Sequence, residues 1–162
     1  MTWRKAFLRQ AETDYLLFCE LNEHKKPLCH QLHYLQMATE KLAKAFTCGP
    51  NNNPPKASHP ALVRFLQISK GRPDLRRDLG FQNNSTFRAY IDSLLPLAEK
   101  IENLVPEGNH LNKPNSEYPW SNGHVLSPLD YNFKTICGNV PNMNKFKTLI
   151  ANLIRIGNRT NA

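Results

Sequence analysis

The stretch "LCHQLHYLQMATEKLAKAF", residues 28–46, decides the fold because it reads as one helix with a regular core-facing stripe. The residues of this stripe recur at steps of four and three, which is the spacing of a helix that packs along its length against other helices. The stripe consists of Leu28, Leu32, Leu35, Thr39, Leu42 and Phe46. A helix that buries so long a stripe needs partners, so the stretch predicts a helical bundle.

Two further stripes run beside the first at the same steps. One consists of Cys29, His33, Gln36, Glu40 and Ala43, and the other of His30, Tyr34, Met37 and Lys41. An amphipathic helix with one buried side would carry mainly lysine and glutamate at these places. Three interpretations stay open: polar groups paired with neighbouring helices, a dimer interface, or a binding or catalytic cleft.

The rest of the chain supplies the partners. Helical periodicity predicts further helices over 2–21, 86–104 and 142–156, with the quoted stretch inside a helix over 27–46. A shorter helix is expected to begin at Ser58, which suits an N-cap, and "GRPDLRRDLGF" is expected to form a turn with one helical turn. The sequence therefore predicts one all-α domain over residues 1–162, an up-and-down bundle of four to five helices.

Residues 105–133 lack helical periodicity and contain several prolines and aromatic residues. A loop this long inside a compact domain is uncommon and is often functional. We expect it to be ordered, with Tyr118, Trp120 and Tyr131 packed on the bundle and shaping the rim of any cleft.

Composition narrows the functional classes. The 162 residues carry a net charge of +8, and no run of 18 apolar residues occurs, so no membrane-spanning helix is expected. The start lacks the apolar run and cleavage site of a signal peptide, which predicts a cytoplasmic protein. The four cysteines form no CxxC pair and are expected to be reduced thiols.

The positive charge is unevenly distributed. From Lys134 to the end the chain has five basic residues and no acidic one, and a second basic group lies between Arg72 and Arg88. Such a distribution favours an anionic partner, usually nucleic acid, although a solvated basic surface would explain it equally well.

Several familiar sites are not predicted. The chain has no glycine-rich phosphate loop and no nucleophile elbow. Cys29 and His33 stand four residues apart and could share one ion, but no histidine is clearly placed to complete a zinc site. Neither a metal nor a cofactor is therefore expected.

The order of the helical motifs resembles the HEPN superfamily. The resemblance covers about residues 5–70 and rests on "AETDYLLF", "CHQLHYLQMATEKLAKAF" and "PPKASHPALVRFLQ". The matching positions of the second and third motifs are Tyr34, Gln36, Glu40, Lys41, Lys44 and His59. The resemblance implies a helical bundle, usually a homodimer, that either accompanies nucleotidyltransferases as a nucleotide-binding partner or acts as a metal-independent ribonuclease.

The ribonuclease members carry an arginine followed after four to six residues by a histidine, and no arginine of this chain has that partner. We therefore expect a non-catalytic module that binds a nucleotide, RNA or a nucleotidyltransferase-type protein. The predicted binding residues are His30, His33, Tyr34, Gln36, Glu40, Lys41, Lys44, His59 and Arg64. The alternative is a divergent ribonuclease of the toxin or phage-defence type that uses His33, His59 and Arg64 as a general base and a cation.

Overall fold

The computed structural model describes residues 1–49, 61–104, 113–121, 123–137 and 140–159. These contain five helices of nine residues or more, which confirms the predicted all-α bundle. The long helices are α1 (Trp3–Glu23), α2 (Leu28–Thr47), α3 (Ala61–Ser69), α5 (Asn84–Glu102) and α7 (Val140–Arg159). The shorter elements are α4 (Pro73–Asp78), α6 (Lys134–Cys137) and the antiparallel strands β1 (Trp120–Ser121) and β2 (Val125–Leu126).

Local sequence explains where the helices begin and end. The side chain of Thr2 accepts a hydrogen bond from the Lys5 amide and caps α1, and Asn83 caps α5 in the same way through the Thr86 amide. Pro27 stands immediately before α2. α5 continues through Pro96. The predicted N-cap at Ser58 lies outside the described residues.

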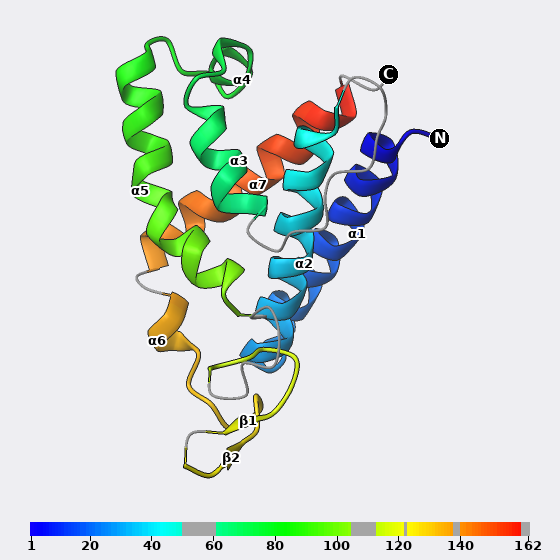
Figure 1. Cartoon of the computed structure of the whole chain (residues 1–162), viewed down its shortest axis with the longest axis vertical. Coiled ribbons are helices and arrows are strands. Elements are labelled where there is room, and N and C mark those ends of the chain that lie inside the picture. Colours follow the sequence, from blue (N-terminus) through cyan, green and yellow to red (C-terminus); the bar gives the residue numbers. More distant parts are fainter. Residues whose placement is uncertain (50–60, 105–112, 122, 138–139, 160–162) are drawn as a thin grey trace.

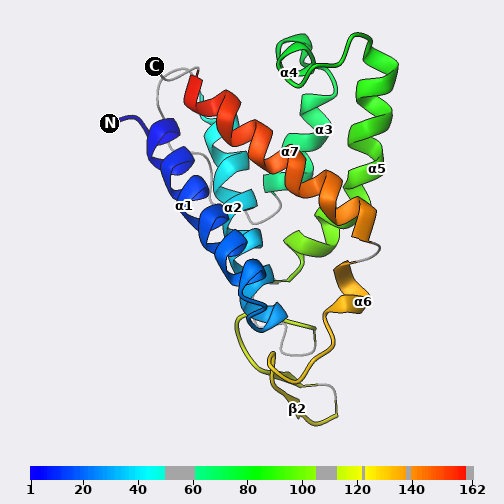
Figure 2. The same cartoon turned by 180° about the vertical axis from the view of Figure 1, so that it is seen from behind.

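The helices pack in two orientations (Figures 1 and 2). α1, α2 and α5 follow the long axis of the molecule, whereas α7 crosses behind them at an oblique angle. The crossing is close at Gly157, where a Cβ atom would lie 2.8 Å from Cδ1 of Leu8 on α1. Glycine at this position therefore lets α7 approach α1 closely.

A hydrogen bond fixes α7 further along the same crossing. The hydroxyl of Tyr15 on α1 donates to the carbonyl oxygen of Lys147 at 2.9 Å. Burial, with a smaller contribution from Cys19, raises the pKa of Tyr15 to about 12, so the donor proton is retained at neutral pH.

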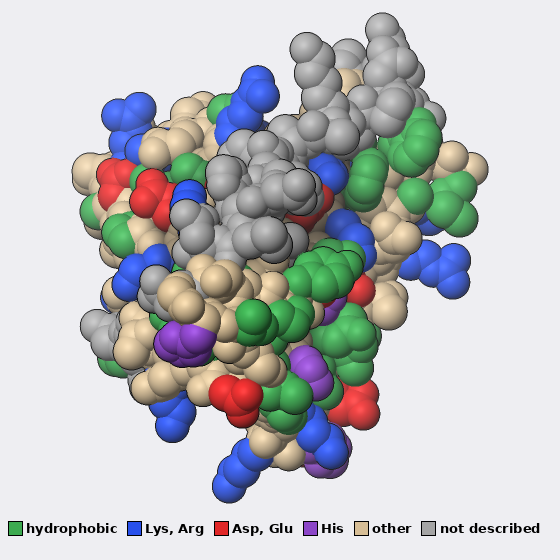
Figure 3. Space-filling model, turned by 60° about the horizontal axis from the view of Figure 1, so that its bottom comes forward, with side chains coloured by type: hydrophobic (Ala, Val, Ile, Leu, Met, Phe, Trp, Pro, Cys, Tyr) green, Lys and Arg blue, Asp and Glu red, His purple; other side chains and the backbone are tan. Residues whose placement is uncertain are grey.

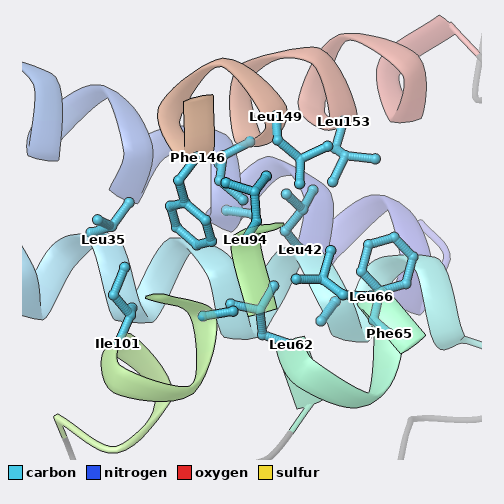
Figure 4. Close-up of a cluster of buried hydrophobic side chains, with 14 of the residues drawn as sticks. Leu35, Leu42, Leu62, Phe65, Leu66, Leu94, Ile101, Phe146, Leu149 and Leu153 are labelled. Carbon is cyan, nitrogen blue, oxygen red and sulfur yellow. The ribbon is translucent and has the colours of Figure 1, made fainter. Parts of the chain in front are cut away.

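The core lies where α2 meets α3, α5 and α7 (Figure 4). Leu35 and Leu42 of the predicted stripe are fully buried there, against side chains such as Phe65 and Phe146. The first turn of α3 is held from α5: the Glu102 carboxylate accepts hydrogen bonds from the amides of Leu62 at 2.8 Å and Val63 at 3.4 Å. None of the described helices is both long and apolar enough to cross a membrane.

The described part of the predicted loop is attached to the lower end of the bundle in Figure 1. The buried Ser116 donates its amide N–H to the carbonyl oxygen of Leu104 at 2.9 Å. Trp120, Tyr131 and Phe133 contact one another, with ring centroids 4.9 to 6.1 Å apart, and belong to the core or pack against it. The packing predicted for Trp120 and Tyr131 is confirmed, whereas Tyr118 is 60% exposed and the prediction for it is wrong.

Candidate functional site

The polar stripes of α2 have different surroundings along the helix. Towards its C-terminal half, Gln36, Glu40, Lys41 and Lys44 lie close to side chains that pair with them. Towards its N-terminal half, His30, His33 and Tyr34 line a pocket. The α1 helix reaches both halves, through Asp14 at Lys41 and through Leu17 and Leu21 at the pocket, whereas loop residues such as Ser116 and Ser127 line the pocket.

The C-terminal half forms a network of paired charges. Nζ of Lys41 lies 2.5 Å from a carboxylate oxygen of Asp14 on α1, and Nζ of Lys44 lies at the same distance from Glu40. The amide of Gln36 donates to the second oxygen of Glu40 at 3.0 Å. The ion-paired side chains are only 15 to 19% exposed. Only the Lys41–Asp14 pair joins two helices, and Oε1 of Gln36 is buried without a described partner. This half therefore fits the first interpretation of the stripes, polar groups paired with neighbouring helices, in part.

The pocket beside the N-terminal half has a volume of about 530 Å³. α1 contributes Leu17 and Leu21 to its wall, and the loop contributes Pro128 and Leu129. Its polar lining consists of His30, His33, Tyr34, Ser116, Glu117 and Ser127. Figure 3 views this end of the molecule, where histidine and hydrophobic side chains gather on one face.

Two planar rings of α2 meet in this wall. The rings of His33 and Tyr34 contact edge to face, with centroids 5.2 Å apart and an interplanar angle of 76°. Nδ1 of His33 is buried and has no hydrogen-bond partner among the described residues.

The pocket has the chemistry of a site for a small planar ligand. Apolar walls, aromatic rings and a few hydrogen-bonding groups are the usual composition of such sites. Among the described lining residues Glu117 is the only one with a formal charge, and neither lysine nor arginine occurs. A phosphate group would find no strong cation there, whereas an uncharged ring with donors and acceptors would find partners.

The structure brings together only some of the predicted binding residues. His30, His33 and Tyr34 share the pocket, whereas Gln36, Glu40, Lys41 and Lys44 belong to the paired network. Arg64 is exposed on α3 and does not line the pocket. His59 lies outside the described residues.

The loop side of the pocket was not predicted residue by residue. Ser116, Glu117 and Ser127 reach it through the contacts that attach the loop to the bundle. The available signal was the combination of prolines and aromatic residues that marks 105–133 as an ordered loop. No group of three or more potential metal ligands occurs in the described part of the chain.

Comparisons with protein-family models, with curated proteins and with solved structures find no match to this chain.

Proposed function

We propose that the chain is a non-catalytic, HEPN-like binding module whose pocket takes the base of a nucleotide or of an RNA. The observation that carries the proposal is the pocket wall in which His30, His33 and Tyr34 of α2 face the polar residues of the loop. A nucleobase is planar, is apolar on its faces and carries hydrogen-bonding groups on its edges, which matches rings, apolar walls and hydroxyls.

Two further observations support the proposal. Asp14 and Lys41, which belong to the HEPN-like motifs, form an ion pair between α1 and α2. The pocket lining that is described contains no cation to stabilise the charge that develops during RNA cleavage. A homodimer and a nucleotidyltransferase-type partner stay predictions.

The pocket is tested by calorimetric titration with AMP, GMP, UMP and CMP, which measures the affinity for each nucleotide. His33→Phe removes the nitrogens but keeps a ring, so we expect affinity to fall about tenfold or more, the loss of one or two hydrogen bonds. Tyr34→Phe and Tyr131→Phe are a matched pair, because both tyrosines are half-buried and Tyr131 lies outside the pocket lining. Only the first should weaken binding.

The free energy of unfolding of the His33→Phe variant distinguishes a binding role of His33 from a structural role. Because Nδ1 of His33 is buried without a described partner, His33→Phe breaks no described hydrogen bond at this atom and should not lower the free energy of unfolding. Absence of nucleotide binding by the wild type, or equal binding by the wild type and the His33 variant, would contradict the proposal.

Catalysis needs a separate assay. Labelled RNA incubated with the wild type in EDTA should stay intact. Cleavage that is lost in a His33→Ala, His59→Ala double variant would replace the binding module by the metal-independent ribonuclease.

A further inference from the structure

The solvent-facing side of α7 carries cations and no acid. The helix, Val140–Arg159, contains Lys145, Lys147, Arg155 and Arg159 but neither aspartate nor glutamate. Lys147 lies apart from the others, with Nζ 6.0 Å from the ring centroid of Phe18 on α1. The other three cations are exposed.

These three cations share one face of the helix. At 100° per residue, Lys145, Arg155 and Arg159 lie within an arc of about 80°, and the first and last are separated by about 21 Å along the axis. Thr148 and Asn152 fall within the same arc. We call these five residues the α7 basic face: Lys145, Thr148, Asn152, Arg155 and Arg159. Figure 2 shows α7 lying across the outside of the bundle, so that its outer side is open to solvent.

The face is held in place from behind. Tyr15 of α1 and Tyr90 of α5 donate hydrogen bonds to the carbonyl oxygens of Lys147 and Lys145, at 2.9 and 3.2 Å. Oδ1 of Asn152 accepts from Nη2 of Arg155 at 3.0 Å, which orients the guanidinium and leaves the Asn152 amide as a donor. These contacts position the backbone of α7 at Lys145 and Lys147 and the guanidinium of Arg155 before any partner binds.

Acids are scarce around this face. Glu12 of α1 lies beside Arg155 and Arg159 at its edge, and its carboxylate accepts a hydrogen bond from Asn158 at 3.2 Å. Among the described residues, none of the ion pairs we find involves Lys145, Arg155 or Arg159. The face therefore offers mainly donors, and its complement is a ligand with negative charge and acceptors repeated over about 20 Å.

We propose that the α7 basic face binds the phosphodiester backbone of an RNA strand. Backbone oxygens only accept hydrogen bonds and carry the repeated negative charge that the face lacks. The inference rests on the proposed function in taking the ligand as a polynucleotide: the pocket takes a base, and the α7 basic face supplies the cations that the pocket does not have.

The test is the salt dependence of binding to a fluorescently labelled oligouridylate, measured by anisotropy. A Lys145→Gln, Arg155→Gln, Arg159→Gln variant should bind more weakly, and the slope of log K against log salt should decrease by about 2, as expected for three lost phosphate contacts. The control, Arg77→Gln, Arg88→Gln, Lys100→Gln, removes the same charge from exposed positions on α4 and α5. The control variant should keep most of the wild-type slope of log K against log salt.

The outcomes separate this inference from the pocket. RNA binding that depends on α7 but persists in His33→Phe supports the α7 basic face even if nucleotides do not bind. Nucleotide binding without RNA binding, or equal losses in the two triple variants, overturns it. Competition by polyglutamate as effective as that by unlabelled oligouridylate also overturns it, because the face would then respond to charge alone. Unchanged melting temperatures of both triple variants show that folding is intact.

Discussion

The two halves of α2 carry polar side chains at the same helical spacing and use them differently. In the C-terminal half, Lys41 pairs with Asp14, and Glu40 pairs with Lys44. In the N-terminal half, His30, His33 and Tyr34 line a pocket, and Nδ1 of His33 has no described partner.

The difference comes from what covers each half. Side chains of α1 and α2 complete the network, whereas the loop reaches the lower end of α2 and leaves space beside it. A half that holds ion pairs stabilises the fold, and a half whose rings line a pocket is available for a ligand. Substitutions in the C-terminal half of α2 should therefore alter the free energy of unfolding, and substitutions in the N-terminal half should alter ligand binding.

Removal of the loop anchor should have the largest effect. Trp120→Ala leaves a cavity among the aromatic rings that attach the loop, so we expect a loss of about 3 kcal/mol in the free energy of unfolding, measured by urea denaturation. The pocket should lose its wall, and with it nucleotide binding. Val125→Ala, in the same loop but 78% exposed and outside the pocket lining, is the control and should leave both measurements unchanged. Equal effects of the two variants would mean that the loop is not attached through Trp120.

Disruption of the paired half should have the second largest effect. Asp14→Ala leaves the Lys41 ammonium mostly shielded from solvent and without this carboxylate. We therefore expect the free energy of unfolding to fall by about 2 kcal/mol, less than for a fully buried pair. Replacing both residues, Asp14→Leu with Lys41→Met, should recover most of this lost stability. Nucleotide affinity should stay the same throughout. If the double variant is as unstable as Asp14→Ala, the loss has another cause.

The smallest effect concerns pH. Burial raises the pKa of the Glu102 carboxyl; the Leu62 and Val63 amides oppose this, and the charges of Glu40 and Glu99 add to it. A carboxyl whose pKa is raised on folding stabilises the fold below its unfolded pKa, and this contribution is lost as pH rises through the folded pKa.

Glu102→Gln keeps an oxygen acceptor for the two amides and cannot ionise. The stability of this variant relative to the wild type should therefore rise from about pH 4 to about pH 7, as followed by urea denaturation at each pH. Glu102→Ala, which removes the acceptor, should be less stable than the wild type by about 1 kcal/mol even at the acidic end. A difference between the glutamine variant and the wild type that is constant over this range would contradict the pKa shift.

The sequence predicted the helices well because their signals are local. The stripe containing Leu35 and Leu42 is buried as expected, and α1, α2 and α5 begin and end within about two residues of the predicted bounds. The short α6 and the two-residue strand β1 were not predicted, since elements of this length carry too little periodicity.

The site was predicted only in part for a different reason. Periodicity assigns His33 and Glu40 to the same stripe, but it does not tell which segment covers the helix at each level. Tertiary contacts decide this: an ion pair to Asp14 in one half, and the loop residues Ser116 and Ser127 in the other. The basic excess after Lys134 was visible in the sequence, but the separation of Lys147 from the α7 basic face required the structure.

The hydrogen bond from Ser116 to Leu104 has a consequence for how this protein can vary. Both residues are buried, and the bond holds together two positions that lie 12 residues apart in the sequence. The entropic cost of bringing two such positions together grows only with the logarithm of the number of residues between them, by about 0.6 kcal/mol for each doubling. A change in that number should therefore lower the free energy of unfolding only slightly as long as the bond forms, and Ser116 and Glu117 would then keep their places in the pocket.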